Sequence, residues 1–360
     1  MNALEGGGGR AARARVHRRR RAAAGGGALI LVAAVAFGVT RLGGVPAGEG
    51  DDGGSGAHAA GASELLALQV TGTRQPSLAL VGTATAERPA SFFTVPAGLT
   101  MTVPGQGETT AAEVAAGSPQ TMRIALSNTF GVWAEHYAVL DLDGLAAAVD
   151  RAGGIRVQVP GFYTTEAGDL GPGAAQLDGE QVAALLDLRA GGAEARWAAV
   201  VQGLLREPLP LDRADLAELS GLDGVRRVLR GAAGAGLALF PTVSVAGSVL
   251  VPSQPGLDRQ VASAFGASLP VPVIVENGVG TPGLGEDVAA LLLPQGFRVT
   301  VSRNAEPFGF ERTRVVANGR GAVADARRIA DALGVGRIGV SQVPSGLGDI
   351  TIIVGEDFTG

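Results

Sequence analysis

The sequence contains no cysteine and no lysine, and its 360 residues include only three histidines, two tryptophans and two tyrosines. Without cysteine the chain can form no disulfide, no thiolate metal site and no cysteine nucleophile. Without lysine it has neither a Schiff-base amine nor the phosphate-binding lysine of a P-loop. Apolar residues nevertheless make up 46% of the chain. That share is enough to build a hydrophobic core, and it excludes wholesale disorder.

All 29 basic residues are arginines, and they are distributed unevenly. Residues 1–41 carry eight arginines and one glutamate, a net charge of +7, whereas the rest of the chain carries a net charge of −12. An acidic bulk argues against a nucleic-acid-binding protein, because the phosphate backbone attracts basic surfaces. We therefore expect no nucleic-acid partner.

A polybasic block is followed by an apolar run near the N-terminus. Seven arginines lie within residues 10–21, and residues 22–40 carry no charge. As a helix this run would span about 28 Å, close to the thickness of a bilayer's hydrocarbon core. The positive-inside rule places the arginines in the cytoplasm and the chain after Arg41 outside. We expect a single-pass anchor in the cell membrane with an extracytoplasmic bulk; a signal peptide cleaved near residues 45–47 is the alternative.

The rest of the chain shows the patterns of a mixed-sheet α/β/α domain and a smaller α/β domain. The first has expected strands at 65–70, 78–81, 91–95, 137–141 and 155–159, with helices at 111–116, 123–127, 142–152, 179–188 and 193–205. The second has strands at 271–275, 297–301, 313–317 and 350–354 and helices at 283–293 and 322–333, in the order βαββαβ. We thus expect a cytoplasmic tail (1–21), a transmembrane helix (22–42), a flexible linker (43–63), a first domain (64–251), a second linker rich in Pro, Gly and Ser (252–270) and a C-terminal domain (271–360).

Residues 277–283 contain the spacing Gly-x-Gly-x-x-Gly between an expected strand and an expected helix. A dinucleotide site would also need an acidic residue near the end of the next strand, where this chain has Arg303. The segment is therefore expected to form a tight strand-to-helix turn.

Several other polar and aromatic residues have both a structural and a functional interpretation. Asp141 and Asp143 could be paired metal ligands, but helix capping explains them as well, and we favour capping. His136 begins a buried strand and has no evident nucleophile partner in the sequence, so we expect a structural role. Trp133 and Tyr163 could stack on sugars or line a lipid pocket, although core packing is the simpler expectation.

Two stretches of the first domain resemble the LytR–CpsA–Psr family. One comprises HYAVLD at 136–141 and GGIRV at 153–157, and the other is LDGEQV at 177–182. The segments 273–285, 296–299 and 352–357 are similar to that family's LytR C-terminal domain. The resemblance covers about residues 64–357, and the order of tail, membrane helix, linker and two domains fits it.

The resemblance implies an extracytoplasmic protein that moves glycopolymers from a polyprenyl pyrophosphate carrier onto peptidoglycan, with Mg²⁺ at the pyrophosphate. Its partners would then be the membrane and a polyprenyl-linked glycan or peptidoglycan. Arginines are needed there to stabilise the leaving anion. Aspartates are needed to hold the metal and to act as base.

The sequence departs from the family pattern where this chemistry needs charge. No aspartate occurs in TGTRQ at 71–75, and the family's Pro-Arg-Asp is replaced by PAG at 96–98. Only Arg74, Arg189 and Arg196 remain as candidate phosphate-binding residues, and no catalytic residue can be assigned. We therefore expect a degenerate domain with weakened or lost phosphotransferase activity, and Mg²⁺ only if that site is active.

Two alternatives remain open beside the weakened ligase. One is a non-enzymatic cell-wall-binding or scaffold protein, and the other is a membrane-bound transcriptional attenuator. An open apolar tunnel with the three arginines at its mouth would favour the ligase. A collapsed core with the arginines scattered would favour the scaffold.

Overall fold

The computed structural model describes residues 62–360 apart from 190, 207–208, 247–248 and 344. The basic tail, the membrane helix expected at 22–42 and nearly all of the first linker lie outside the described residues, so they stay predictions. Within the described part, no helix combines the length and the apolar character that crossing a membrane requires.

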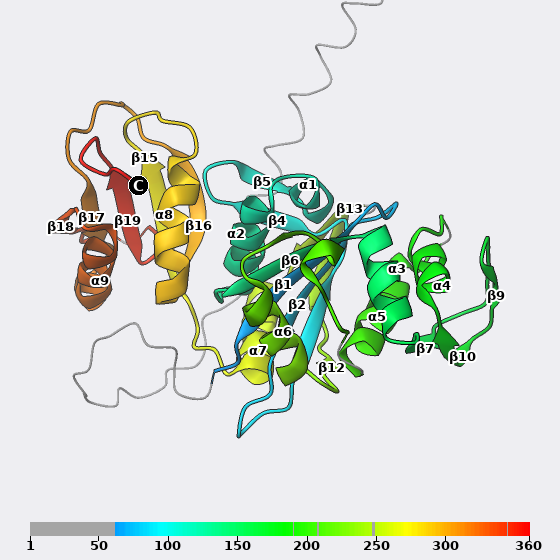
Figure 1. Ribbon diagram of the computed structural model, residues 1–360. Helices are drawn as coiled ribbons and strands as arrows, with labels where there is room; N and C mark the ends of the chain where they lie inside the picture. Colours follow the sequence, from blue (N-terminus) through cyan, green and yellow to red (C-terminus); the bar gives the residue numbers. More distant parts are fainter. Residues whose placement is uncertain (1–61, 190, 207–208, 247–248, 344) are drawn as a thin grey trace, which may run out of the picture. The chain divides into compact units, whose positions relative to one another are not determined.

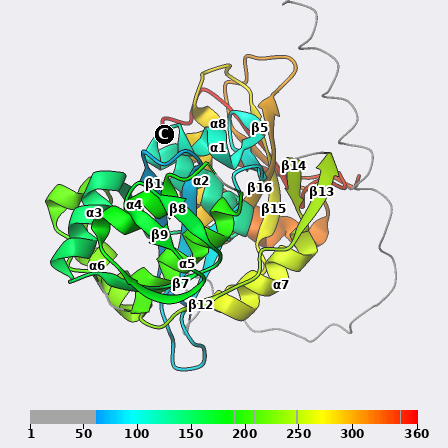
Figure 2. The same cartoon turned by 90° about the vertical axis from the view of Figure 1, so that its right-hand side faces the viewer.

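The first domain is a mixed sheet with helices on both faces (Figures 1 and 2). Its strands are β1 Leu65–Thr71, β2 Ser77–Gly82, β3 Ser91–Val95, β4 Thr100–Val103, β5 Gly107–Thr110, β6 His136–Asp141, β7 Ile155–Val159, β8 Tyr163–Thr165, β9 Gly168–Leu170, β10 Gly173–Leu177, β11 Leu216–Leu219, β12 Gly236–Leu237, β13 Thr242–Ala246 and β14 Val249–Pro252. Its helices are α1 Ala111–Ala115, α2 Pro119–Phe130, α3 Leu142–Arg151, α4 Gly179–Leu186, α5 Ala193–Arg206, α6 Leu222–Gly231 and α7 Gln254–Phe265. The main sheet has the order β11-β6-β1-β2-β3-β12, with β6 parallel and β2 antiparallel to β1.

Both faces of the central strands are buried, because side chains alternate across a sheet. Leu66 and Leu68 of β1 pack in one apolar cluster with α3, α4, α5 and α6. Leu65 and Ala67 pack in a second cluster with α1, α2 and α7. The predicted α/β/α layering of this domain is confirmed.

The segment 252–270 is not a linker over its whole length, because α7 occupies Gln254–Phe265. A proline is tolerated in the first turn of a helix, where its missing N–H needs no partner, and Pro255 stands there. Leu257, Val261 and Phe265, spaced four residues apart, are buried in the second cluster of the first domain. The linker interpretation was wrong because the proline marks the start of a helix.

The C-terminal domain is a five-stranded sheet with two helices. Its elements are β15 Val271–Asn277, α8 Leu284–Leu292, β16 Phe297–Asn304, β17 Arg314–Ala317, α9 Val323–Leu333, β18 Arg337–Val340 and β19 Ile350–Val354. The strand order is β16-β15-β19-β17-β18. The predicted βαββαβ order is confirmed except for one additional strand, β18, between α9 and the last strand.

The glycine-rich segment after β15 forms the expected tight turn. The Asn277 side chain accepts hydrogen bonds from the backbone N–H groups of Val279 and Gly280 at 3.1 and 2.7 Å, and it donates to the Thr281 carbonyl at 2.8 Å. The amides that a dinucleotide phosphate would use are thus already bound within the turn.

Helix α2 of the first domain contacts strand β16 of the C-terminal domain through polar side chains. The Asn128 amide group accepts from the Val299 N–H at 2.8 Å and donates to the Val299 carbonyl at 2.9 Å. Arg298 binds both carboxylate oxygens of Asp258 on α7, at 3.1 and 2.7 Å, and donates to the Asn128 carbonyl at 3.1 Å. These contacts join the two domains at buried positions.

Candidate functional site

The loop between α4 and α5 carries Arg189, and it contacts two other arginines that the sequence singled out, Arg74 and Arg196. Its position is fixed by the LDGEQV motif, in which Asp178 caps α4 and forms a reciprocal capping box with Gln181. Gly179 lies so close to α3 that an added Cβ would stand 2.2 Å from the Ala146 carbonyl oxygen. The motif therefore sets the start of α4 and its packing against α3.

The three candidate arginines meet around this loop. Arg74, from the turn after β1, donates from Nε to the Asp187 carbonyl at 2.9 Å, and its Nη2 lies 3.4 Å from the Asp187 carboxylate. Arg196, on α5, donates to the carbonyls of Gly191 at 2.6 Å and Leu188 at 3.0 Å. Arg189 is an exposed residue of the loop itself. The sequence identified these three residues. It could not show that the guanidinium groups of two of them bind backbone carbonyls of the loop.

Arg196 is the most buried of the three, with only 1% of its surface exposed. Its guanidinium also lies 5.3 Å from the ring centre of Tyr163, a favourable cation–π distance. Tyr163 therefore packs on a protein group, as expected for a core residue. Phosphate binding by Arg74, Arg189 and Arg196 stays a prediction, and in this structure Arg196 and Arg74 hold the loop in place.

The space beside the loop is nearly filled. A void between β2, β3 and α5 has a volume of about 10 Å³ and is lined by residues that include Ser77, Val95 and Trp197. Such a volume holds one water molecule at most. The Trp197 indole is buried, and its N–H donates to the Leu78 carbonyl at 2.8 Å. No lipid chain fits at this point.

The acidic residues do not form a metal site. The Asp141 carboxylate accepts from the Gly144 N–H at 2.6 Å and caps α3. The capping role is thus confirmed for Asp141, whereas Asp143, the expected cap, lies in the first turn of the helix. Among the described residues, no group of three His, Asp or Glu side chains could hold a metal ion.

His136 lies in a cluster that the sequence did not reveal. Its Nε2 is 2.8 Å from a Glu64 carboxylate oxygen, and its Nδ1 is 3.4 Å from the Ser220 hydroxyl. Ser220 is 84 residues away in the chain and comes close because β11 pairs with β6. However, Arg227 binds both oxygens of Glu64, and the Ser220 hydroxyl accepts from the Tyr137 N–H. The cluster ties strand ends together, in keeping with a structural role for His136.

Glu64 makes this cluster sensitive to acid. Hydrogen bonding from Arg227 is the main cause that lowers the pKa of Glu64, helped by His136 and opposed by partial burial. A lowered pKa in the folded state adds stability above the ordinary glutamate pKa of about 4.3, and this contribution is lost as the pH falls through the folded value. The stability gap between the wild type and Glu64→Gln should therefore be largest near neutral pH and close below pH 4. Urea unfolding at several pH values would measure it, and a gap that stays constant with pH would contradict the prediction.

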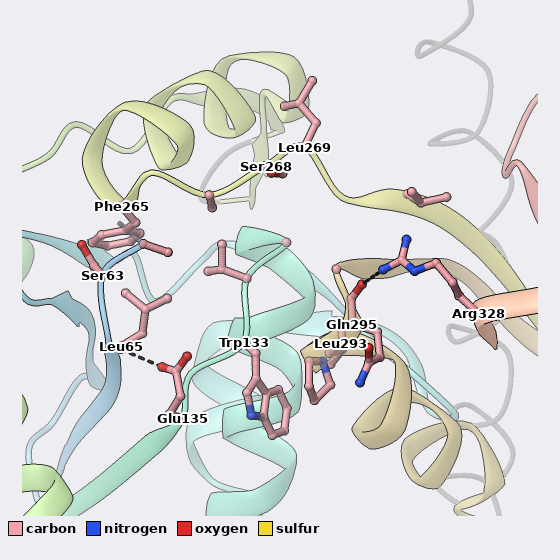
Figure 3. A pocket seen from close by; sticks show the side chains of 17 residues that line it. Ser63, Leu65, Trp133, Glu135, Phe265, Ser268, Leu269, Leu293, Gln295 and Arg328 are labelled. Carbon is pink, nitrogen blue, oxygen red and sulfur yellow. Dashed lines mark hydrogen bonds between the residues drawn. The ribbon is translucent and has the colours of Figure 1, made fainter. Parts of the chain in front are cut away.

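A second, larger cavity lies where the first domain meets the C-terminal domain (Figure 3). Its volume is about 330 Å³, and its lining includes Leu65, Glu135, Phe265, Leu293 and Arg328. Its two charged groups have partners: Glu135 accepts from the Leu65 N–H at 2.7 Å, and Arg328 donates to the Gln295 carbonyl at 2.6 Å. The cavity is mixed in character, with no concentration of positive charge for a pyrophosphate.

Trp133 also lines this cavity, and a neighbouring side chain packs on its ring. The Arg123 guanidinium lies 4.0 Å from the ring centre, and the tryptophan packs against the core of the C-terminal domain. Desolvation by burial lowers the pKa of Arg123 from its usual value. The packing role expected for Trp133 agrees with this arrangement.

Comparison with protein-family models gives two matches. The model described as the LytR_cpsA_psr family matches residues 77–194, and the model described as LytR cell envelope-related transcriptional attenuator matches residues 270–358. No curated protein matches the chain.

Solved structures with similarity to the chain include three bacterial proteins. TagV of Bacillus subtilis is 13% identical with a TM-score of 0.46, over 56% of this chain and 96% of its own. YwtF (TagT) of the same species, with bound octaprenyl pyrophosphate lipid, is 14% identical with a TM-score of 0.45, over 57% and 91%. A LytR-Csp2A-Psr enzyme from Actinomyces oris is 19% identical with a TM-score of 0.43, over 57% and 90%.

Proposed function

The chain carries a LytR–CpsA–Psr domain and a LytR C-terminal domain, and from this premise we propose that it acts in cell-envelope glycopolymer assembly without an effective ligase site. It would be anchored in the membrane by residues 22–42, with both domains outside the cell. Its role there is to bind wall glycan or assembly partners rather than to transfer the polymer.

The arrangement of the arginine-bearing loop supports this proposal above all. A pyrophosphate site needs guanidinium groups that point at the ligand and can stabilise the negative charge that develops on the leaving group. Arg196 instead donates to two carbonyls of its own loop, and Arg74 binds Asp187. The adjacent void of about 10 Å³ leaves no room for a carrier lipid. The small void beside Trp197 favours the non-enzymatic alternative, for which a filled groove is expected.

Two assays on the purified full-length protein test the proposal together. We expect no phosphate release from undecaprenyl pyrophosphate above the buffer rate, with or without Mg²⁺, and saturable co-sedimentation with peptidoglycan sacculi. Arg74→Ala should leave both results unchanged, as should Arg259→Ala, an exposed arginine on α7 that serves as the matched control.

Two outcomes would contradict it in different ways. Phosphate release that Arg74→Ala abolishes and Arg259→Ala does not would show a working ligase site. A protein that neither cleaves the pyrophosphate nor binds sacculi or polyprenyl phosphate would remove the envelope function altogether.

A further inference from the structure

The two edge strands of the C-terminal sheet differ in what their outward backbone groups contact. At the β16 edge, the Asn128 side chain bonds to both the N–H and the carbonyl of Val299. At the opposite end of the strand order lies β18, with no further strand beside it in the part of the chain that the structure describes (Figure 1). Open strand edges can pair with other chains, and proteins usually cover or blunt them.

The backbone of β18 offers its free hydrogen-bonding groups at two apolar residues. The Arg337 N–H donates to the Thr313 carbonyl at 2.9 Å, and the Ser341 N–H donates to the Ala317 carbonyl at 2.8 Å. Because these groups alternate in direction along a strand, the N–H and carbonyl groups of Ile338 and Val340 point away from β17. An added strand would bond to these two residues.

The side chains of the same two residues continue the apolar face of the sheet. Ile338 lies beside Val315 and Val340 lies beside Ala317 in the β17–β18 register. Val315 and Ala317 are fully buried in the cluster that contains α9, whereas Ile338 and Val340 are 43% and 47% exposed. The apolar face of the sheet therefore extends to β18, where its side chains are exposed to solvent.

The opposite face of the edge is basic. Arg337 lies beside Arg314 in the register, and both are exposed. With Arg312, Glu311 and Phe308 they line an open hollow of about 600 Å³, so its charged lining is three arginines and one glutamate. Apolar and basic faces thus meet along a single strand edge, and an occupant must match both.

We propose that β18 is a docking edge for an extended acidic peptide segment of a partner protein, which adds to the sheet as a sixth strand. Alternate apolar side chains of the segment would cover Ile338 and Val340, and its intervening carboxylates would bind Arg337 and Arg314. This is β-strand addition, in which main-chain bonds give affinity and alternate side chains give specificity.

Charge distinguishes this occupant from a second copy of the chain. Two β18 strands paired across a two-fold axis would place the Arg337 and Arg314 pairs of both copies on one face of the joined sheet, where like charges repel. A segment that alternates apolar and acidic residues relieves that repulsion. The site also lies apart from the arginine-bearing loop, so it goes beyond the function proposed above.

Fluorescence anisotropy with a labelled, end-blocked peptide of alternating Val and Glu tests the proposal on the full-length protein. We expect saturable binding, with affinity at least tenfold lower for the peptide of the same composition ordered in Val-Val-Glu-Glu blocks. Arg337→Glu and Val340→Pro should each weaken binding at least tenfold. The proline removes an outward N–H without removing a bond to β17, so the fold should survive, and circular dichroism checks that it does. Arg259→Glu is the charge-matched control and should bind like the wild type.

Three results would overturn the proposal. The first is equal affinity for the alternating and the block peptide, which would reduce the site to general electrostatic attraction. The second is binding that survives both Arg337→Glu and Val340→Pro. The third is a concentration-dependent dimer in sedimentation that Val340→Pro disrupts, which would make a second copy the occupant.

Discussion

Replacement of Arg298 by alanine is expected to lower the free energy of unfolding by about 3–5 kcal/mol, the usual cost of removing one partner of a buried ion pair. Only 8% of Arg298 is exposed, and it binds Asp258 through two hydrogen bonds and the Asn128 carbonyl through a third. Without the guanidinium, a partly buried carboxylate and a buried carbonyl lose their donors. Since Arg298 lies on the C-terminal domain and both of its partners lie on the first domain, the C-terminal domain should also unfold separately.

Calorimetry and urea unfolding of the full-length protein would detect both effects. The matched control is Arg327→Ala on α9 of the same domain, because Arg327 is exposed. Substitutions at the surface usually change stability little, so this variant should stay within about 1 kcal/mol of the wild type with a single transition. Equal effects of the two substitutions would show that the buried pair does not hold the domains together.

Local patterns predicted many elements of this fold, but none was expected at 206–251, where α6 and β11 to β13 lie. The continuous apolar runs of β1 and β2 and the capping of α3 are properties of a few neighbouring residues, so they can be found in one sequence. Strand β18 was not predicted, because it has only four residues and most of them are exposed. Helix α7 was not predicted because Pro255 and Gly256 near its start are typical of a linker.

The candidate site was harder to predict because its contacts join distant parts of the chain. Arg74 and Asp187 are 113 residues apart, and His136 and Ser220 are 84 apart. The sequence identified which arginines remained but could not show where their guanidinium groups point. That direction depends on the loop at 187–192, whose carbonyl groups accept the bonds of Arg74 and Arg196.

Replacement of Trp197 by alanine should destabilise the first domain by about 3–5 kcal/mol, as large-to-small changes at buried aromatic residues do. The indole is 3% exposed and belongs to the cluster between the sheet and α5. Its loss would leave a cavity and would take the side-chain donor from the Leu78 carbonyl. Trp197→Phe separates the two causes, because it keeps most of the ring but loses the N–H. We expect it to cost about 1–3 kcal/mol in urea unfolding.

Trp197→Ala also tests whether a filled core accounts for the proposed lack of ligase activity. If Trp197 and its neighbours fill the space that a carrier lipid would need, Trp197→Ala should bind a short polyprenyl phosphate or a small apolar probe that the wild type does not bind, since engineered apolar cavities accept such guests. Ligand binding to the folded state alone raises its stability. A saturating probe should therefore raise the melting temperature of Trp197→Ala and leave the wild type and Trp197→Phe unchanged. If the wild type gained equally, the carrier site would be open already, and the proposed lack of ligase activity would need a cause other than a filled core.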